Sequence, residues 1–240
     1  MKTVTVIFED EDILVIDKPS GIAAEETNTQ KVITLSEILK KEFGIPLFRG
    51  GLVHRLDKDT SGVMVVAKTQ KALDVLQAQF KGRKTKKEYL ALVHGFIMES
   101  GVVDAANARN PLKREKFTVL LEGKEAVTEF SPISNFKFPI SNWETIFNDF
   151  NKIQMRKLER MNYNEFTLLK CKPLTGRTHQ IRVHLKYIHH PIVADEKYVG
   201  RKMVRIDKRW CPRMFLHAKR LGFYHPTTGK WMEMEAELPE

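Results

Sequence analysis

The chain has 240 residues, of which 42% are hydrophobic and 29% are charged, as in an ordinary soluble globular protein. It has two cysteines and no apolar run near the roughly 20 residues that span a bilayer, which excludes disulfide-rich secreted proteins and membrane-spanning helices. Its 40 Lys and Arg against 30 Asp and Glu give a net charge of +10, which favours a polyanionic partner.

The first segment predicts two short strands and a helix. Residues 4–8 and 13–17 have the composition of strands and flank an acidic turn. A turn that contains Pro and Gly follows at 18–21. Apolar residues at helical spacing then predict a helix over 35–43, which ends at Gly44.

Residues 54–62 read His-Arg-Leu-Asp-Lys-Asp-Thr-Ser-Gly and stand directly before the apolar run 63–67. The run predicts a buried strand. Asp57 therefore lies on a loop held by a rigid element, where catalytic side chains are often found. On these residues alone a structural role is the commoner outcome, in which Asp57 caps a turn or pairs with Arg55 at the surface.

A capped helix is expected over 69–82, followed by a strand over 88–93. Tyr89 lies where basic residues meet this strand. A tyrosine on a half-buried strand usually belongs to the core. It can instead stack on a base while Lys86 and Lys87 hold phosphates.

Further strands are expected at 102–103, 126–130 and 166–171. The stretch 135–164 is rich in Phe, Asn, Lys and Arg, and its hydrophobic periodicity is blurred. We interpret it as an insertion that contains a basic, helix-like piece at 152–160. The pattern leaves open whether the insertion is a folded arm or a mobile loop.

A second informative block, 175–185, places a Gly turn before a helix that is expected to run from Thr178 and to stop before Pro191. Its first turns carry Arg177 and Arg182. Arg182 lies at the margin of the apolar stripe, where an arginine is expected to need a carboxylate partner. The alternative is that its side chain extends to solvent, which is the commoner outcome for a helix arginine.

Two strands at 216–223 and 231–236 are expected to close the chain. Strands outnumber helices and often follow one another directly, which predicts an α+β chain with a mixed, largely antiparallel sheet. The length suits one domain, with two subdomains around a central cleft. His179 and His184 do not share a helical face, and no metal site is expected.

These blocks together resemble the RluA-type pseudouridine synthases, whose pattern they follow in order. The matching segments are the Lys-Pro-x-Gly turn at 18–21, the Asp57 block at 54–62, the strand at 87–95, the helix block at 175–184, and the Leu-His-Ala and Phe-x-His-Pro pieces at 216–218 and 223–226. Two departures bear on the identity of the RNA. Residues 22–25 lack a histidine that the family often has there, and the insertion exceeds the usual short connection. The pattern begins at residue 4, so we expect no N-terminal S4 domain and a single catalytic domain over 1–240.

The resemblance implies the pseudouridine synthase fold and an isomerisation in which uracil leaves C1′ of its ribose, turns and rejoins through C5. It implies that Asp57 is the nucleophile and that Arg182 keeps this carboxylate charged. Tyr89 would lie against the uracil. Arg55 would fill the gap that the flipped nucleotide leaves. The residues expected to contact RNA are Arg55, Lys86, Lys87, Arg177 and His179.

The implied partner is structured RNA, ribosomal RNA foremost and transfer RNA as a second possibility. The basic clusters at 81–87 and 197–213 flank the matched blocks and suit such a partner. No cofactor, metal or membrane is expected. We expect a monomer in the cytoplasm, or in an organelle interior after processing, because no signal peptide precedes the first strand.

Two other functions stay open at this point. The Asp-x-Asp-x-Thr arrangement at 57–60 also fits aspartate-nucleophile phosphatases, which need Mg²⁺ and a later acidic pair for which Asp195 and Glu196 are poor candidates. The other is an RNA-binding protein of the same fold that has lost catalysis.

Overall fold

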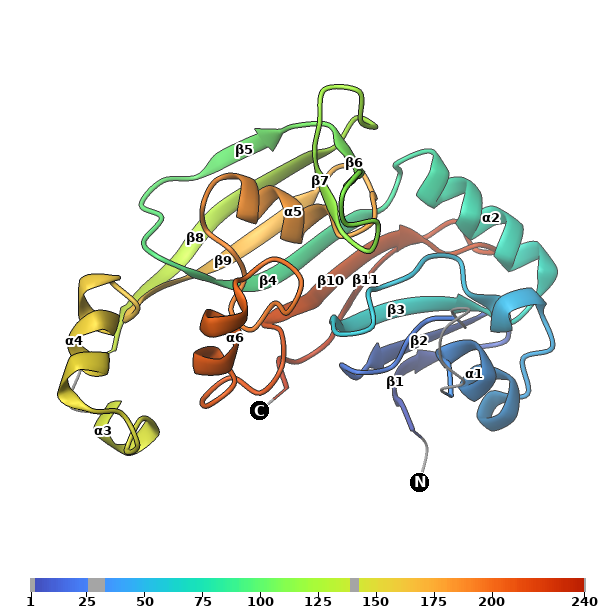
Figure 1. The fold of residues 1–240 in the computed structure, drawn as a ribbon. Coiled ribbons are helices and arrows are strands. Elements are labelled where there is room, and N and C mark those ends of the chain that lie inside the picture. Colours follow the sequence, from blue (N-terminus) through green and yellow to red (C-terminus); the bar gives the residue numbers. More distant parts are fainter. Residues whose placement is uncertain (1–2, 26–32, 139–142, 240) are drawn as a thin grey trace. The chain divides into compact units, whose positions relative to one another are not determined.

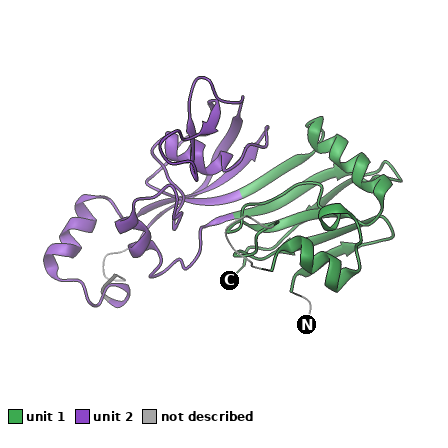
Figure 2. Ribbon diagram, turned by 45° about the vertical axis from the view of Figure 1, so that its right-hand side comes forward, with its two compact units in different colours: residues 1–89, 217–240 green, residues 90–216 purple. Residues whose placement is uncertain are grey.

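A computed structural model describes residues 3–25, 33–138 and 143–239 (Figure 1). These residues confirm the predicted α+β class, with strands in the majority and mostly antiparallel pairing. They form two compact units, residues 1–89 with 217–240 and residues 90–216 (Figure 2). None of the helices in the described ranges is long and apolar enough to cross a membrane.

The sheet of the first unit has the strand order β1-β2-β3-β10, and β11 pairs with β10. Its strands are β1 (Thr5–Glu9), β2 (Ile13–Lys18), β3 (Ser61–Ala67), β10 (Leu216–Tyr224) and β11 (Trp231–Glu235). Neighbours pair antiparallel except β3 and β10, which are parallel. All seven residues of β3 are buried, so the strand that follows the Asp57 loop is the centre of this unit's core, as the apolar run predicts.

Two helices pack on this core, and local cap signals fix their ends. Helix α1 (Leu35–Phe43) begins after a capping box at Thr34 and ends at Gly44, whose φ of +63° favours glycine. Helix α2 (Gln70–Lys81) begins after Thr69, whose hydroxyl accepts the Ala72 N–H. Both helices are confirmed. A 3₁₀ turn, η1 (Phe48–Gly51), follows α1.

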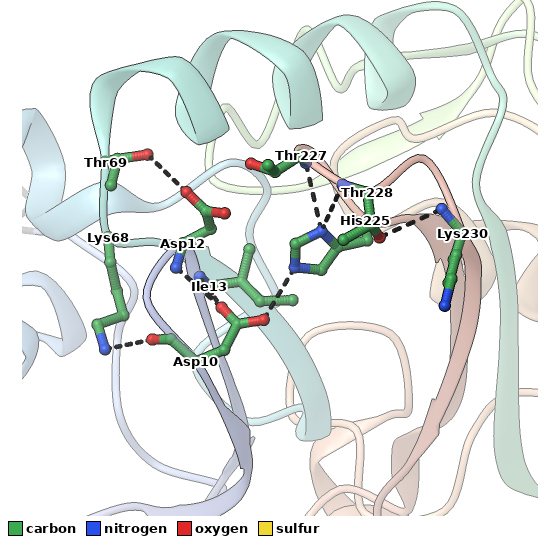
Figure 3. Close-up of polar contacts among 9 residues, drawn as sticks. All are labelled: Asp10, Asp12, Ile13, Lys68, Thr69, His225, Thr227, Thr228 and Lys230. Carbon is green, nitrogen blue, oxygen red and sulfur yellow. Dashed lines mark hydrogen bonds and ion pairs between the residues drawn. The ribbon is translucent and has the colours of Figure 1, made fainter.

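The C-terminal hairpin is tied to the turn between β1 and β2 through His225 (Figure 3). The Nδ1 atom of His225 accepts the N–H groups of Thr227 and Thr228 at 3.2 and 3.1 Å, so the proton is on Nε2. That Nε2–H donates to Asp10 Oδ2 at 2.8 Å, while Asp10 Oδ1 accepts the N–H of Ile13. The His-Pro motif therefore joins the two ends of the chain within the first unit.

In the second unit the strand order is β4-β9-β8-β5. The strands are β4 (Lys86–His94), which starts in the first unit, β5 (Gly101–Asp104), β8 (Val127–Lys137) and β9 (Glu165–Pro173). A separate hairpin pairs β6 (Asn107–Arg109) with β7 (Phe117–Val119). Helix α5 (Gln180–Tyr187) packs against β7, β8 and β9, and α6 (Arg201–Asp207) follows it.

The stretch interpreted as an insertion is a folded arm. It continues β8 to Lys137 and then forms α3 (Trp143–Ile146) and α4 (Lys152–Arg160), the second of which has the bounds of the predicted basic helix (Figure 1). Its buried side chains Phe147, Leu158 and Tyr163 share a core cluster with Phe166, Val193, Ala194 and Cys211.

Tyr163 also connects the arm to the rest of this unit. Its hydroxyl donates to the buried Asp207 carboxylate at 2.7 Å, and the same carboxylate accepts the Ala194 N–H at 2.9 Å. Deleting the arm would leave Asp207 short of a partner and open the core. Substitutions of exposed arm residues keep these buried contacts, so they change the surface of the arm without disturbing the core of the unit.

Candidate active site

The Asp57 loop is a tight turn between buried anchors. The backbone carbonyl of Asp57 accepts the Thr60 N–H at 3.1 Å. Thr60 and Ser61 are buried, Asp57 is half-buried and Arg55 is exposed. The turn thus holds a carboxylate at the boundary between the core and solvent.

Lys18 lies beneath this loop and clamps it. The side chain is fully buried, and its Nζ donates to the carbonyls of Pro19, Ile22 and Lys58 at 2.9, 3.0 and 3.1 Å. Burial lowers the pKa of Lys18 to about 8, against the opposing effect of the negative charges of Asp59 and Asp57. The buried cation therefore joins the first motif to the second.

The rest of the 18–21 turn adds to this clamp. The Gly21 N–H donates to the Lys58 carbonyl at 2.9 Å, and the Ser20 hydroxyl donates to the Asp59 carbonyl at 2.8 Å. The sequence predicts only a turn at 18–21 and misses the role of Lys18. A lysine that ends a mostly apolar, buried strand is the signal that could have indicated this role.

A second clamp joins the Asp57 loop to strand β10. The carbonyl of Ala236 can only accept, so the His217 Nε2 atom at 3.1 Å carries the proton. His217 Nδ1 then accepts the Ser61 hydroxyl at 2.9 Å, and both side chains are fully buried. Gly62 has a φ of +120°, and a Cβ there would lie 2.3 Å from the Ala218 carbonyl oxygen. The Thr-Ser-Gly and Leu-His-Ala motifs are thus two sides of one strand pairing.

His54 supports the same loop as a neutral side chain. Its Nε2 accepts the Val65 N–H at 3.2 Å, and its ring stacks on Phe80 with 4.4 Å between centroids. Burial and the positive charge of Lys87 lower the pKa of His54 to about 3. The imidazole therefore stays uncharged at neutral pH and acts as a hydrogen-bond acceptor.

The pKa of His54 predicts a loss of stability in acid. Between pH 6.5, its ordinary value, and pH 3 the unfolded chain binds more protons at this residue than the folded chain. The stabilisation is full above pH 6.5 and is lost as the pH falls toward 3. Urea unfolding of His54→Gln, which keeps an acceptor but does not titrate, should show a pH slope shallower by up to about 1.4 kcal/mol per pH unit. Equal slopes for His54→Gln and wild type would disprove this role.

Tyr89 lies in the first unit with Asp57 and packs against the core cluster. Burial, together with the negative charge of Asp57, raises the pKa of Tyr89 well above its ordinary value. The phenol is therefore protonated at neutral pH and is a hydrogen-bond donor. Of the two neighbouring lysines, Lys87 is half-buried and Lys86 is exposed, with its Nζ 5.4 Å from the centre of the Trp231 ring.

In the second unit, Arg182 is buried and pairs with a carboxylate, as the sequence predicts, but the carboxylate is that of Asp195. Its Nε and Nη2 donate to the two oxygens of Asp195, each at 2.8 Å, and both side chains are buried. The guanidinium also lies 5.1 Å from the centre of the Tyr198 ring. The alternative in which Arg182 extends to solvent is wrong. Asp57 belongs to the first unit, and its pairing with Arg182 stays a prediction.

Asp195 is a residue that the sequence analysis missed as a site residue. Besides Arg182, its Oδ1 accepts the N–H groups of Lys197 and Tyr198 at 3.0 and 3.3 Å. The phosphatase alternative would need this carboxylate as a metal ligand, and it is already fully engaged by donors. Among the described residues, no three potential metal-ligating side chains gather.

The start of the Arg182 helix corrects a prediction. Helix α5 begins at Gln180 and not at Thr178, because His179 has a φ of +56° that interrupts the helix, and His179 makes no side-chain cap. The buried Gln180 side chain instead fixes the turn that precedes the helix and joins it to β8. Its Oε1 accepts the Arg177 N–H at 3.0 Å and its Nε2 donates to the Val127 carbonyl at 2.9 Å.

Arg177 and His179, both expected to contact RNA, have partners inside the protein. Arg177 Nε donates to the Glu125 carbonyl at 2.9 Å. His179 Nδ1 lies 2.8 Å from the Tyr198 hydroxyl, and its ring meets Phe117 edge-on. Both side chains are half-buried, so the structure gives each a positioning contact in addition to any contact with RNA.

Comparisons with known proteins agree with this geometry. A model of the family described as RNA pseudouridylate synthase matches residues 12–187, which include Asp57, Tyr89 and Arg182. The chain is 41% identical to an uncharacterized RNA pseudouridine synthase of Aquifex aeolicus, over 99% of this chain and 70% of that protein. It is 37% identical to ribosomal large subunit pseudouridine synthase D of Pseudomonas aeruginosa, over 98% of this chain and 68% of that protein. The solved structure of human RNA pseudouridylate synthase domain containing 1 matches with a TM-score of 0.74 and 26% identity, over 99% of this chain and 84% of that chain.

Proposed function

The chain belongs to the RNA pseudouridylate synthase family and is an isomerase, and we propose that it converts specific uridines of large-subunit ribosomal RNA to pseudouridine through Asp57. The observation that carries the proposal is the Asp57 loop. Two buried clamps, from Lys18 and from the Ser61–His217 pair, fix one half-buried carboxylate, whose negative charge helps to raise the pKa of Tyr89.

The proposed reaction uses these groups as follows. Asp57 attacks the nucleoside or assists the departure of uracil from C1′. The detached base turns within the site and forms a bond from C5 to C1′. The hydrogen on C5 then leaves as a proton, and N1 gains one, so atoms and electrons balance without a redox step. Holding the free base in place is as important as the nucleophile, because a base that escapes cannot rejoin.

Tyr89 and Arg182 are proposed to serve Asp57 in different ways. The phenol of Tyr89 is protonated, so it can donate to the uracil or relay a proton but does not begin the reaction as a base. Arg182 is proposed to pair with the Asp57 carboxylate. The Asp195 pair would hold its guanidinium in a fixed orientation for that purpose.

The RNA target is proposed from the relatives and from charge. Relatives in several bacteria are named ribosomal large subunit pseudouridine synthase D, which favours ribosomal over transfer RNA. The net charge of +10 suits a phosphate backbone. Arg55, exposed two residues before Asp57, is proposed to occupy the place that the flipped uridine vacates.

Mapping of pseudouridines in total RNA from cells with and without the gene tests this function. Loss of one or a few sites in large-subunit ribosomal RNA is the expected result. Loss confined to transfer RNA would overturn the ribosomal target, and an unchanged map would overturn the proposed activity in the cell. Restoring the gene with Asp57→Asn should leave the map as it is in the deletion strain.

A further inference from the structure

Helix α4 of the arm carries a surface charge that the site described above does not use. Its exposed cations are Lys152, Arg156, Lys157 and Arg160, against a single carboxylate in Glu159. None of the four cations forms an ion pair with a carboxylate in the described part of the chain. Unpaired cations on one helix favour a polyanionic ligand over a structural role.

A pocket of about 310 Å³ opens beside this helix. Phe150 and Met155 supply apolar wall, while Asn148, Lys152 and Arg156 supply polar groups. This volume is at the lower end of the range for small-molecule sites, about 300–1,000 Å³. It suits one nucleobase better than a helical stem.

The pocket is built on fixed supports. Phe147, which also lines it, is buried in the core of the second unit. Arg209 lies 4.7 Å from the centre of the Phe150 ring, and its Nη2 donates to Asp149 at 2.7 Å. A capping box at Asn151 fixes the start of α4. The aromatic wall and the cations are therefore held in place before any ligand arrives, which reduces the cost of binding.

We propose that this arm pocket binds an unpaired nucleotide of the RNA substrate, an inference that rests on the proposed function. The base stacks on Phe150 and packs against Met155, while Lys152 and Arg156 hold the adjacent phosphates. The Asn148 amide and the Glu159 carboxylate offer hydrogen-bond partners to the base edge. The arm then contributes to the choice of RNA without touching the reacting uridine.

Binding of a labelled single-stranded RNA of about ten nucleotides, within the range of about 4–16 that such sites cover, tests the pocket on the purified full-length protein. In Lys152→Gln/Arg156→Gln, the slope of log affinity against log salt should fall by about 1.4, for two contacts at about 0.7 each. Phe150→Leu keeps apolar bulk but lacks the aromatic face, and should lose affinity by about tenfold. The matched control Lys157→Gln/Arg160→Gln removes the same charge from the same helix outside the pocket, and should lose much less.

Equal losses of RNA affinity in the two double variants would show that the helix attracts RNA only through its overall positive charge. That result would overturn the proposed nucleotide site in the pocket. Wild-type affinity in Phe150→Leu would overturn base stacking. Thermal unfolding of each variant identifies a folding defect. If Phe150→Leu fails to fold, the two charge variants decide alone, since their side chains are exposed. Pseudouridine formation by the same preparations separates the two proposals. If the pocket variants form pseudouridine normally and bind RNA as wild type does, only the pocket proposal is wrong. If wild type forms no pseudouridine, the proposed function is wrong.

Discussion

Asp57→Asn is expected to reduce pseudouridine formation by about 10⁴-fold or more, because an amide has neither the charge nor the nucleophilic oxygen of a carboxylate. The amide has nearly the same size, and the backbone carbonyl of residue 57 still accepts the Thr60 N–H. RNA affinity should therefore change little. Digestion of the treated RNA and chromatographic separation of uridine from pseudouridine measures the effect.

Asp59→Asn is the matched control for this result. Asp59 lies two residues away on the same turn and is also half-buried. Its backbone carbonyl accepts the Ser20 hydroxyl, and an asparagine keeps that carbonyl. This variant should retain most of the activity. Turnover that survives in Asp57→Asn would remove Asp57 as the nucleophile, and equal losses in both variants would point to disturbance of the loop.

Arg182→Met should lower the free energy of unfolding by about 3–5 kcal/mol, because it leaves the buried Asp195 carboxylate without its cation. Asp195 is fully buried, and the arginine supplies two of its donors. The two that remain are backbone N–H groups. Urea unfolding of the purified variant measures the loss.

The double variant Arg182→Met/Asp195→Asn separates stability from catalysis. The asparagine is neutral, and its oxygen can still accept the N–H groups of Lys197 and Tyr198. Much of the lost stability should return, since replacing both members of a buried pair costs less than removing one. Activity should stay low if Arg182 also acts on Asp57. A stable double variant with wild-type turnover would show that Arg182 serves the fold alone.

Local signals in the sequence account for the elements that were predicted well. Gly44 ends α1 and Thr69 begins α2. Each forms a hydrogen bond with a backbone group of its own helix only a few residues away, so the local sequence is enough to predict these ends. The buried strand β3 follows from the unbroken apolar run at 63–67. The basic helix at 152–160 also has a local capping box that fixes its start.

The contacts that build the candidate site are long-range, and periodicity does not encode them. Ser61 and His217 are 156 residues apart, and the Lys18 contact with the Lys58 carbonyl spans 40. The resemblance places the motifs in order along the chain but does not say which of them touch. Lys18 and His217 therefore looked like parts of a turn and a strand, although they hold the Asp57 loop.

Helix α5 shows a different limit. Its predicted start at Thr178 rests on a common cap residue, but the left-handed conformation of His179 delays the helix, and the Gln180 side chain holds the preceding turn through the Arg177 N–H. The sequence leaves the conformation of the arm open because its buried aromatic residues, Phe147 and Tyr163, lie in turns beside short helices and follow no helical or strand period. They pack on Val193 and Cys211, which are distant in sequence.

Release of tritium from a large-subunit ribosomal RNA transcript labelled at C5 of uridine tests the central claim most directly. Every conversion of uridine to pseudouridine expels the C5 hydrogen, so release reports the bond change itself. Purified wild-type protein should release tritium to a plateau set by a small number of sites, with no added cofactor and in the presence of a chelator, and Asp57→Asn should release none above background. Equal release by wild type and Asp57→Asn would contradict the account, as would a folded wild-type protein that binds the transcript and releases none.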